Sequence, residues 1–130
     1  MNCKIFLRKV LFPLIGLWVL GSLMNSAALA AECAIEDKTS WEKCKGKPVK
    51  VSGPRLVMDD VPTYYMLADP AMSGGEGFQD YIEVAETQVI LHTKDEVECP
   101  DKMEIEGSVK QLDLEGEKAW AIDVTQLTCK

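Results

Sequence analysis

Apolar and polar residues alternate over short stretches after the first third of the chain, a pattern typical of β-strands with one buried face. The last two stretches, 103–112 and 118–127, are joined by a tight turn at 115–116 and predict a hairpin. The stretches 80–86 and 88–93 predict either two consecutive strands or one kinked strand. The remaining predicted strands are 47–52, which continues as 55–58, and the aromatic stretch 63–67.

A glycine interrupts the first of these predicted strands. Val49 and Val51 alternate with Lys50 up to Gly53, and the pattern resumes at Arg55. A glycine inside a strand pattern indicates a bulge or a sharp bend. We therefore expect a bent first strand, as in a small barrel.

A short helix is predicted before the first strand, at residues 39–46. Thr39 can cap it, Glu42 lies three residues further on as in a capping box, and Gly46 can end it. The predicted connections are a turn at 59–62, a long irregular Gly-rich stretch at 71–79 and a charged loop at 94–101.

Residues 1–30 have the organisation of a secretory signal peptide. A basic start, an uncharged apolar run over 10–24 and small residues at the −3 and −1 positions follow one another in that order. An uncleaved anchor is disfavoured, because the run contains Pro13 and is shorter than the roughly 20 residues that a spanning helix needs. We therefore expect a single domain over 31–130, periplasmic or secreted, with no stable membrane insertion.

The net charge of the chain favours some classes of binding partner and excludes others. The formal net charge is −7, with 14 Lys and Arg against 21 Asp and Glu. The predicted leader carries Lys4, Arg8 and Lys9 but no acid, so its removal makes the remaining domain more acidic. Such a surface repels nucleic acid and anionic lipid and favours cationic partners. We expect a protein or a cationic small ligand as the partner, and no nucleic acid.

Four of the five cysteines lie in the predicted domain. An even number in a small exported domain predicts two disulfides. Zinc ligation is the competing interpretation, but no two of these cysteines have the close spacing of zinc ligands. The residues concerned are Cys33, Cys44, Cys99 and Cys129.

Four cysteines allow three connectivities, and the predicted hairpin favours one of them. Centring the turn on 115–116 sets Val109 opposite Ile122. Cys99 and Cys129 then fall just beyond the open end of the hairpin. The preferred pairs are Cys99–Cys129 and, with the cysteines that remain, Cys33–Cys44.

Five or six short strands and one small helix predict an all-β fold. Their order matches a small five-stranded Greek-key barrel of the oligonucleotide/oligosaccharide-binding type, the OB-fold. Four blocks of the sequence carry strand motifs: GKPVKVSG (46–53), YYMLAD (64–69), MEIEGSV (103–109) and AWAIDVTQL (119–127). In these blocks the chain resembles small exported bacterial OB-fold proteins, and the resemblance implies a role at the cell envelope, for example in stress tolerance. It departs from that group in the longer Gly-rich loop after Asp69 and in the 94–101 loop, where many OB-folds have a helix.

Catalytic motifs do not emerge from the sequence. His92 is the only histidine, and we expect it to be half buried and hydrogen-bonded at a strand end. No nucleophile–base set, phosphate-binding glycine loop or metal-ligand spacing accompanies it. We therefore expect no enzyme, metal or cofactor. The methionines Met58, Met66, Met72 and Met103 are expected to fill the core.

The candidate ligand-binding residues lie in and around the two connections at 59–62 and 71–79. Aromatic side chains on an OB sheet stack against bases or sugar rings, and carboxylates attract cations. Trp120 is expected in the core, in register with Ile122. The sequence thus predicts an exported, non-enzymatic binding module, the alternative being a small-molecule or oligosaccharide-binding OB domain. The candidate site residues are Asp59, Asp60, Tyr65, Phe78 and Tyr81.

Overall fold

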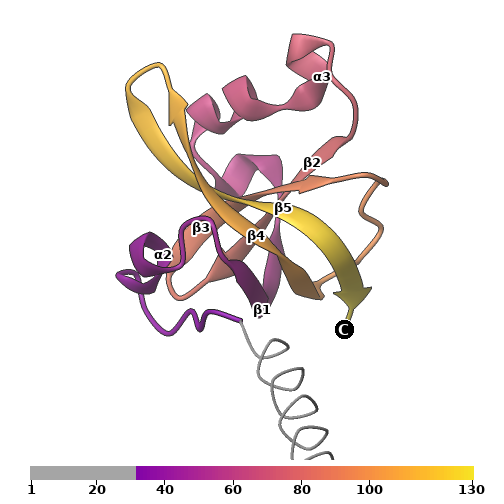
Figure 1. The fold of residues 1–130 in the computed structure, drawn as a ribbon. Coiled ribbons are helices and arrows are strands. Elements are labelled where there is room, and N and C mark those ends of the chain that lie inside the picture. The colour runs from indigo at the N-terminus through magenta and orange to yellow at the C-terminus, as the bar shows by residue number, and fades with distance from the viewer. Residues whose placement is uncertain (1–31) are drawn as a thin grey trace, which may run out of the picture. The chain divides into compact units, whose positions relative to one another are not determined.

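The computed structural model describes residues 32–130, about half of which lie in five strands (Figure 1). The predicted signal segment 1–30 lies outside the described residues. The strands are β1 (Pro48–Leu56), β2 (Phe78–Val84), β3 (Thr87–Thr93), β4 (Lys102–Leu114) and β5 (Glu117–Cys129). The helices are α2 (Ser40–Lys43), η1 (Met58–Asp60), η2 (Thr63–Ala68) and α3 (Pro70–Ser73), where η denotes a 3₁₀-helix. The prediction of a mostly β fold is confirmed.

The strands pair with one another in a closed ring. Their order is β1-β2-β3-β5-β4, and the ring closes because β1 pairs with both β2 and β4. Every pair is antiparallel except β3 and β5, which run parallel from Ile90 opposite Ala121 to His92 opposite Asp123. The ring therefore encloses the inward-facing side chains of all five strands.

Strand β1 bends where the sequence predicts it to bend. It pairs with β4 from Pro48 to Pro54 and then with β2 through Arg55 and Leu56. A Cβ atom at Gly53 would collide with the backbone oxygen of Glu83, so only glycine permits this close approach.

The β4–β5 hairpin has the predicted register from its turn down to Gly107, with Val109 opposite Ile122. Beyond Gly107 the ladder shifts by one residue, which the sequence pattern does not predict, and it ends with Met103 opposite Cys129. The turn residues Glu115 and Gly116 have φ values of 57° and 95°, as a two-residue hairpin turn requires.

Both disulfides are present with the preferred pairing. Cys33–Cys44 ties the segment before α2 to the end of that helix, with Cα atoms 5.6 Å apart. Cys99–Cys129 joins the β3–β4 loop to the end of β5, with Cα atoms 5.2 Å apart. Such pairs indicate folding in an oxidising environment.

The prediction of a strand at 63–67 is wrong, because these residues form the 3₁₀-helix η2. Pro62 precedes it at φ −58°, and the Tyr65 amide donates to the Pro62 carbonyl at 3.1 Å. The helical turn packs the Tyr65 ring against Tyr81 of β2, with ring centroids 6.2 Å apart. Tertiary packing therefore overrides the β preference of an aromatic stretch.

The chain around the other predicted connections is also more regular than expected. Within 71–79, α3 occupies the beginning and β2 starts at Phe78. The Asp69 carboxylate caps α3 by accepting from the Ala71 amide at 3.0 Å. The predicted stretches 80–86 and 88–93 correspond to two separate strands, β2 and β3, which form a hairpin with its turn at Ala85 and Glu86.

Two groups of buried side chains fill the interior. The larger contains Trp41, Ile82, Leu91 and Ile105, and the half-buried Trp120 ring stacks on Trp41 at 6.3 Å. The smaller lies beneath the β1–β2 connection and contains Val61, Tyr65, Tyr81, Ile90, Leu114, Ala119 and Ala121.

Candidate functional site

The connection between β1 and β2 carries the most distinctive surface of the described residues. We call residues 57–78 the β1–β2 arm; it comprises η1, η2, α3 and the first residue of β2. In Figure 1 the arm extends away from the strands of the barrel at one end, where η2 contacts β4. Its inner side covers the smaller core group.

The arm exposes large apolar side chains to solvent. Every exposed large hydrophobic side chain among residues 32–130 lies in the arm. Met72 is 67% exposed and Met58 is 51% exposed, so the expectation that these methionines fill the core is wrong, whereas Met103 of β4 is fully buried as expected. The full set of exposed large hydrophobics is Val57, Met58, Met66, Leu67, Met72 and Phe78.

The charges of the arm have a single sign. Its ionisable side chains other than tyrosine are the carboxylates Asp59, Asp60, Asp69 and Glu76. The chain contains no lysine or arginine between Arg55 and Lys94. The arm thus combines exposed apolar groups with negative charge and has no cation of its own to neutralise it.

Three of the five candidate site residues lie on this surface. Asp59 and Asp60 are exposed on η1, and Phe78 is 46% exposed at the start of β2. The structure buries the other two: Tyr65 is 6% exposed and Tyr81 is 5% exposed. An exposed stacking platform containing Tyr65 and Tyr81 is therefore wrong for this conformation.

Tyr65 instead anchors the arm to the barrel. Its hydroxyl donates to the Gln88 carbonyl of β3 at 2.9 Å, and burial raises its pKa to about 12. The Gln88 side-chain amide in turn donates to the Asp60 carbonyl of η1. These contacts fix the inner side of the arm to β3 and leave its outer side free.

A second anchor is built from Gln79 and His92. The Gln79 side-chain amide lies 2.9 Å from both the Tyr65 carbonyl and the Tyr81 hydroxyl. The His92 Nε2 atom lies 2.8 Å from Gln79 Oε1 and 3.1 Å from the Ala68 carbonyl at the end of η2. His92 is half buried, as predicted.

The other nitrogen of His92 sets the tautomer of the ring. Lys110 Nζ lies 3.1 Å from Nδ1 and 2.7 Å from Asp123 Oδ1. An ammonium group can only donate, so Nδ1 accepts and Nε2 carries the proton that is donated to the arm. Burial, and secondarily the charge of Lys110, lowers the pKa of His92. The hydrogen bond to the Ala68 carbonyl and the charges of Asp123 and Asp69 oppose this shift without reversing it.

The exposed methionines and the anchoring roles of Gln79 and Gln88 could not be predicted from the sequence. Met58, Met66 and Met72 have no helical or strand period, so their exposure follows only from the short helices η1, η2 and α3 that carry them. The lack of cations from residue 56 to 93 is the signal that was visible in the sequence.

Among residues 32–130 no group of three or more His, Cys, Asp and Glu side chains is placed to hold a metal ion. In the same part of the chain no helix has the length and apolarity needed to cross a membrane. Comparisons of the chain with protein-family models, with curated proteins and with solved structures find no match.

Proposed function

We propose that this protein is an exported, non-enzymatic binding module of the cell envelope, whose β1–β2 arm receives a cationic, amphipathic segment of another protein. The observation that carries the proposal is the confinement of the exposed large hydrophobics of residues 32–130 to an arm whose charges are all negative. Several large apolar side chains exposed on one segment of a folded domain are typical of an interaction site.

The chemistry of the arm specifies the partner. Met58, Met66 and Met72 are unbranched and polarisable, so they adapt to partner surfaces of varied shape. The surrounding carboxylates favour Lys and Arg on the partner and accelerate its association. A partner with a basic and apolar face would satisfy both features of the arm.

The fold and the location support the same proposal. The ring order β1-β2-β3-β5-β4 and the parallel β3–β5 pair favour an OB-type Greek-key barrel. The two disulfides and the signal-like segment 1–30 favour the periplasm or the extracellular space. The burial of Tyr65 and Tyr81 weighs against the alternative of sugar or base stacking.

The test uses a synthetic amphipathic helical peptide of Leu and Lys, and its Leu and Glu counterpart, with binding followed by fluorescence anisotropy. We expect the Lys peptide to bind and the Glu peptide not to bind. Replacing Met58, Met66 and Met72 by Ser should weaken the affinity at least tenfold. Equal affinity for both peptides, or no effect of the Ser replacements, would refute the proposal.

A matched pair of charge variants separates the arm from the overall charge. Asp59→Asn with Asp60→Asn removes two charges from η1, whereas Glu42→Gln with Glu117→Gln removes two exposed charges elsewhere. Only the first pair should weaken binding of the Lys peptide. An equal loss in both variants would show that net charge, and not the arm, attracts the peptide.

A further inference from the structure

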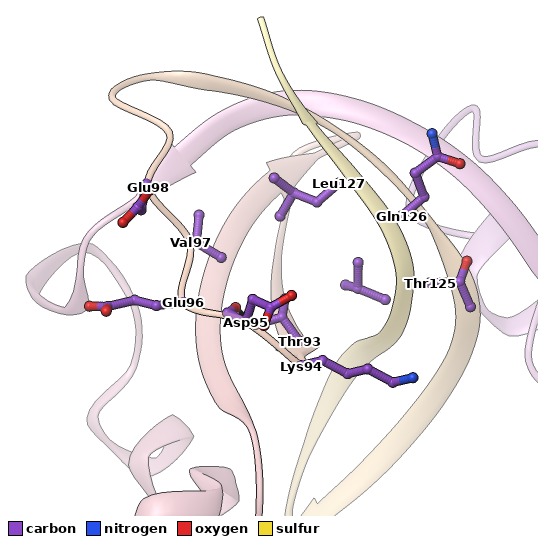
Figure 2. Close-up of a pocket in the computed structure, with 10 residues that line it drawn as sticks. Thr93, Lys94, Asp95, Glu96, Val97, Glu98, Thr125, Gln126 and Leu127 are labelled. Atoms are coloured by element: carbon purple, nitrogen blue, oxygen red, sulfur yellow. Dashed lines mark hydrogen bonds between the residues drawn. The ribbon is translucent and has the colours of Figure 1, made fainter.

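A groove runs between the β3–β4 loop and the last part of β5, and it is formed by residues outside the arm. Its volume is about 440 Å³. Figure 2 shows the acidic loop on one side and β5 on the other, with Val97 and Leu127 between them. The lining is Thr93, Lys94, Asp95, Glu96, Val97, Glu98, Val124, Thr125, Gln126 and Leu127.

One wall of the groove is an unpaired strand edge. The pairing of β5 with β3 ends where Asp123 meets His92, whereas its pairing with β4 continues to Cys129. Along residues 124–128, no strand within the described part of the chain pairs with the side of β5 that faces away from β4. This edge therefore offers backbone N–H and C=O groups to an additional strand.

The exposed edge has no charged side chain and no proline. Natural proteins guard such edges with charged side chains or proline. Residues 124–128 read VTQLT and contain neither. A register shift in the β4–β5 ladder sets Val124 opposite Gly107 and Gln126 opposite Glu106, so no β4 residue lies directly opposite Thr125. This shift allows Val124 and Leu127, three residues apart, to line the same groove.

The opposite wall combines one apolar residue with negative charge. Val97 is 7% exposed and packs against the core, whereas Asp95, Glu96 and Glu98 are exposed on either side of it. Lys94 is the only cation in the lining. A ligand here would meet an apolar floor and an acidic rim.

Strand pairing and a disulfide fix the positions of the two walls of the groove relative to each other. The β3–β5 pairing closes one end of the groove, and the Cys99–Cys129 disulfide joins loop and strand at the other. The Arg55 guanidinium, which also pairs with Asp80 at 2.8 Å, donates to the Cys99 carbonyl at 2.6 Å. Such a preformed groove binds an extended ligand with little ordering of its own residues.

We propose that this groove binds a short extended segment of another protein, in which apolar residues alternate with Lys or Arg, as an added strand along the free edge of β5. Backbone hydrogen bonds to residues 124–128 supply affinity, and alternate side chains are read by the apolar floor and the acidic rim. The site is separate from the arm and does not depend on the function proposed for it.

The test uses a capped synthetic peptide of alternating Val and Lys, its Val and Glu counterpart, and the disulfide-bonded protein. We expect only the Lys peptide to bind, and at saturation to slow hydrogen exchange of the amides in 124–128 at least tenfold. Glu96→Lys with Glu98→Lys should weaken binding at least tenfold. Glu42→Lys with Glu117→Lys, which changes the net charge equally at exposed positions, should leave the affinity within twofold.

Four results would overturn the proposal. The Lys peptide could fail to bind, or the Glu peptide could bind equally well. Both charge variants could lose affinity equally, or the Lys peptide could bind without slowing hydrogen exchange at the β5 edge. Concentration-dependent dimerisation that protects the same amides without peptide would instead assign the edge to a second copy. Replacement of Met58, Met66 and Met72 by Ser, which tests the arm, should leave this peptide's affinity unchanged.

Discussion

The β1–β2 arm and the β4–β5 hairpin differ in how they place their apolar side chains. The hairpin places Met103, Ile105 and Ile122 fully inside and is held by a continuous backbone ladder. The arm exposes Met58 and Met72 to solvent. It is attached to the barrel by a few side-chain contacts to β3 and by its packing against the smaller core group. The hairpin therefore keeps its large apolar side chains inside the barrel, whereas the arm leaves several of its own at the surface.

Methionine substitution gives the largest expected contrast between the two regions. Met103→Ala removes a fully buried side chain and should lower the free energy of unfolding by roughly 2–5 kcal/mol. Met72→Ala removes an exposed one and should change it by less than about 0.5 kcal/mol. Urea unfolding of both variants measures the difference. Similar losses would mean that Met72 packs against the protein in solution.

Loss of the Gln79 anchor should affect mainly the arm. Gln79→Ala removes the contacts to Tyr65, Tyr81 and His92, and should cost about 1–3 kcal/mol because buried groups lose their partners. Hydrogen exchange should accelerate in the arm more than in β4 and β5. Gln126→Ala, at an exposed glutamine, is the matched control. Uniform acceleration over the whole domain would argue that arm and barrel open together.

The smallest expected effect is a dependence on pH. The pKa of His92 is lowered in the folded protein by burial and by Lys110, so the unfolded state binds a proton at higher pH than the folded state does. The resulting stability is present above the ordinary pKa of 6.5 and is lost as the pH falls from there through the folded-state pKa. Asp123 and Asp69 oppose the shift without reversing it.

Thermal unfolding from pH 7.5 to 5 measures this loss. His92→Gln keeps a donor for the Ala68 carbonyl but cannot titrate, so its stability should decline less over the same range. If wild type and variant declined in parallel, the titration of His92 would not control the anchoring of the arm.

The same two regions show what sequence patterns can predict here. The hairpin register near its turn could be predicted because alternation and a two-residue turn are local features, and this register in turn favours the Cys99–Cys129 pair. The segment 63–67 could not, because its aromatic residues favour a strand, and only contact between Tyr65 and Tyr81 makes a 3₁₀-helix the better choice. The groove could not be predicted either, because it forms where the pairing of β5 with β3 ends, and these two strands are far apart in the sequence.

The missing cations have one more consequence, which concerns proteases. An exposed, irregular connection is usually where a folded domain is first nicked. Trypsin-like enzymes cleave only after Lys or Arg, and the chain has neither from residue 56 to 93. The arm and the β2–β3 hairpin therefore offer no cleavage site to this class of enzyme, even when they unfold locally. The segment with the exposed large hydrophobics is thus also resistant to trypsin-like cleavage.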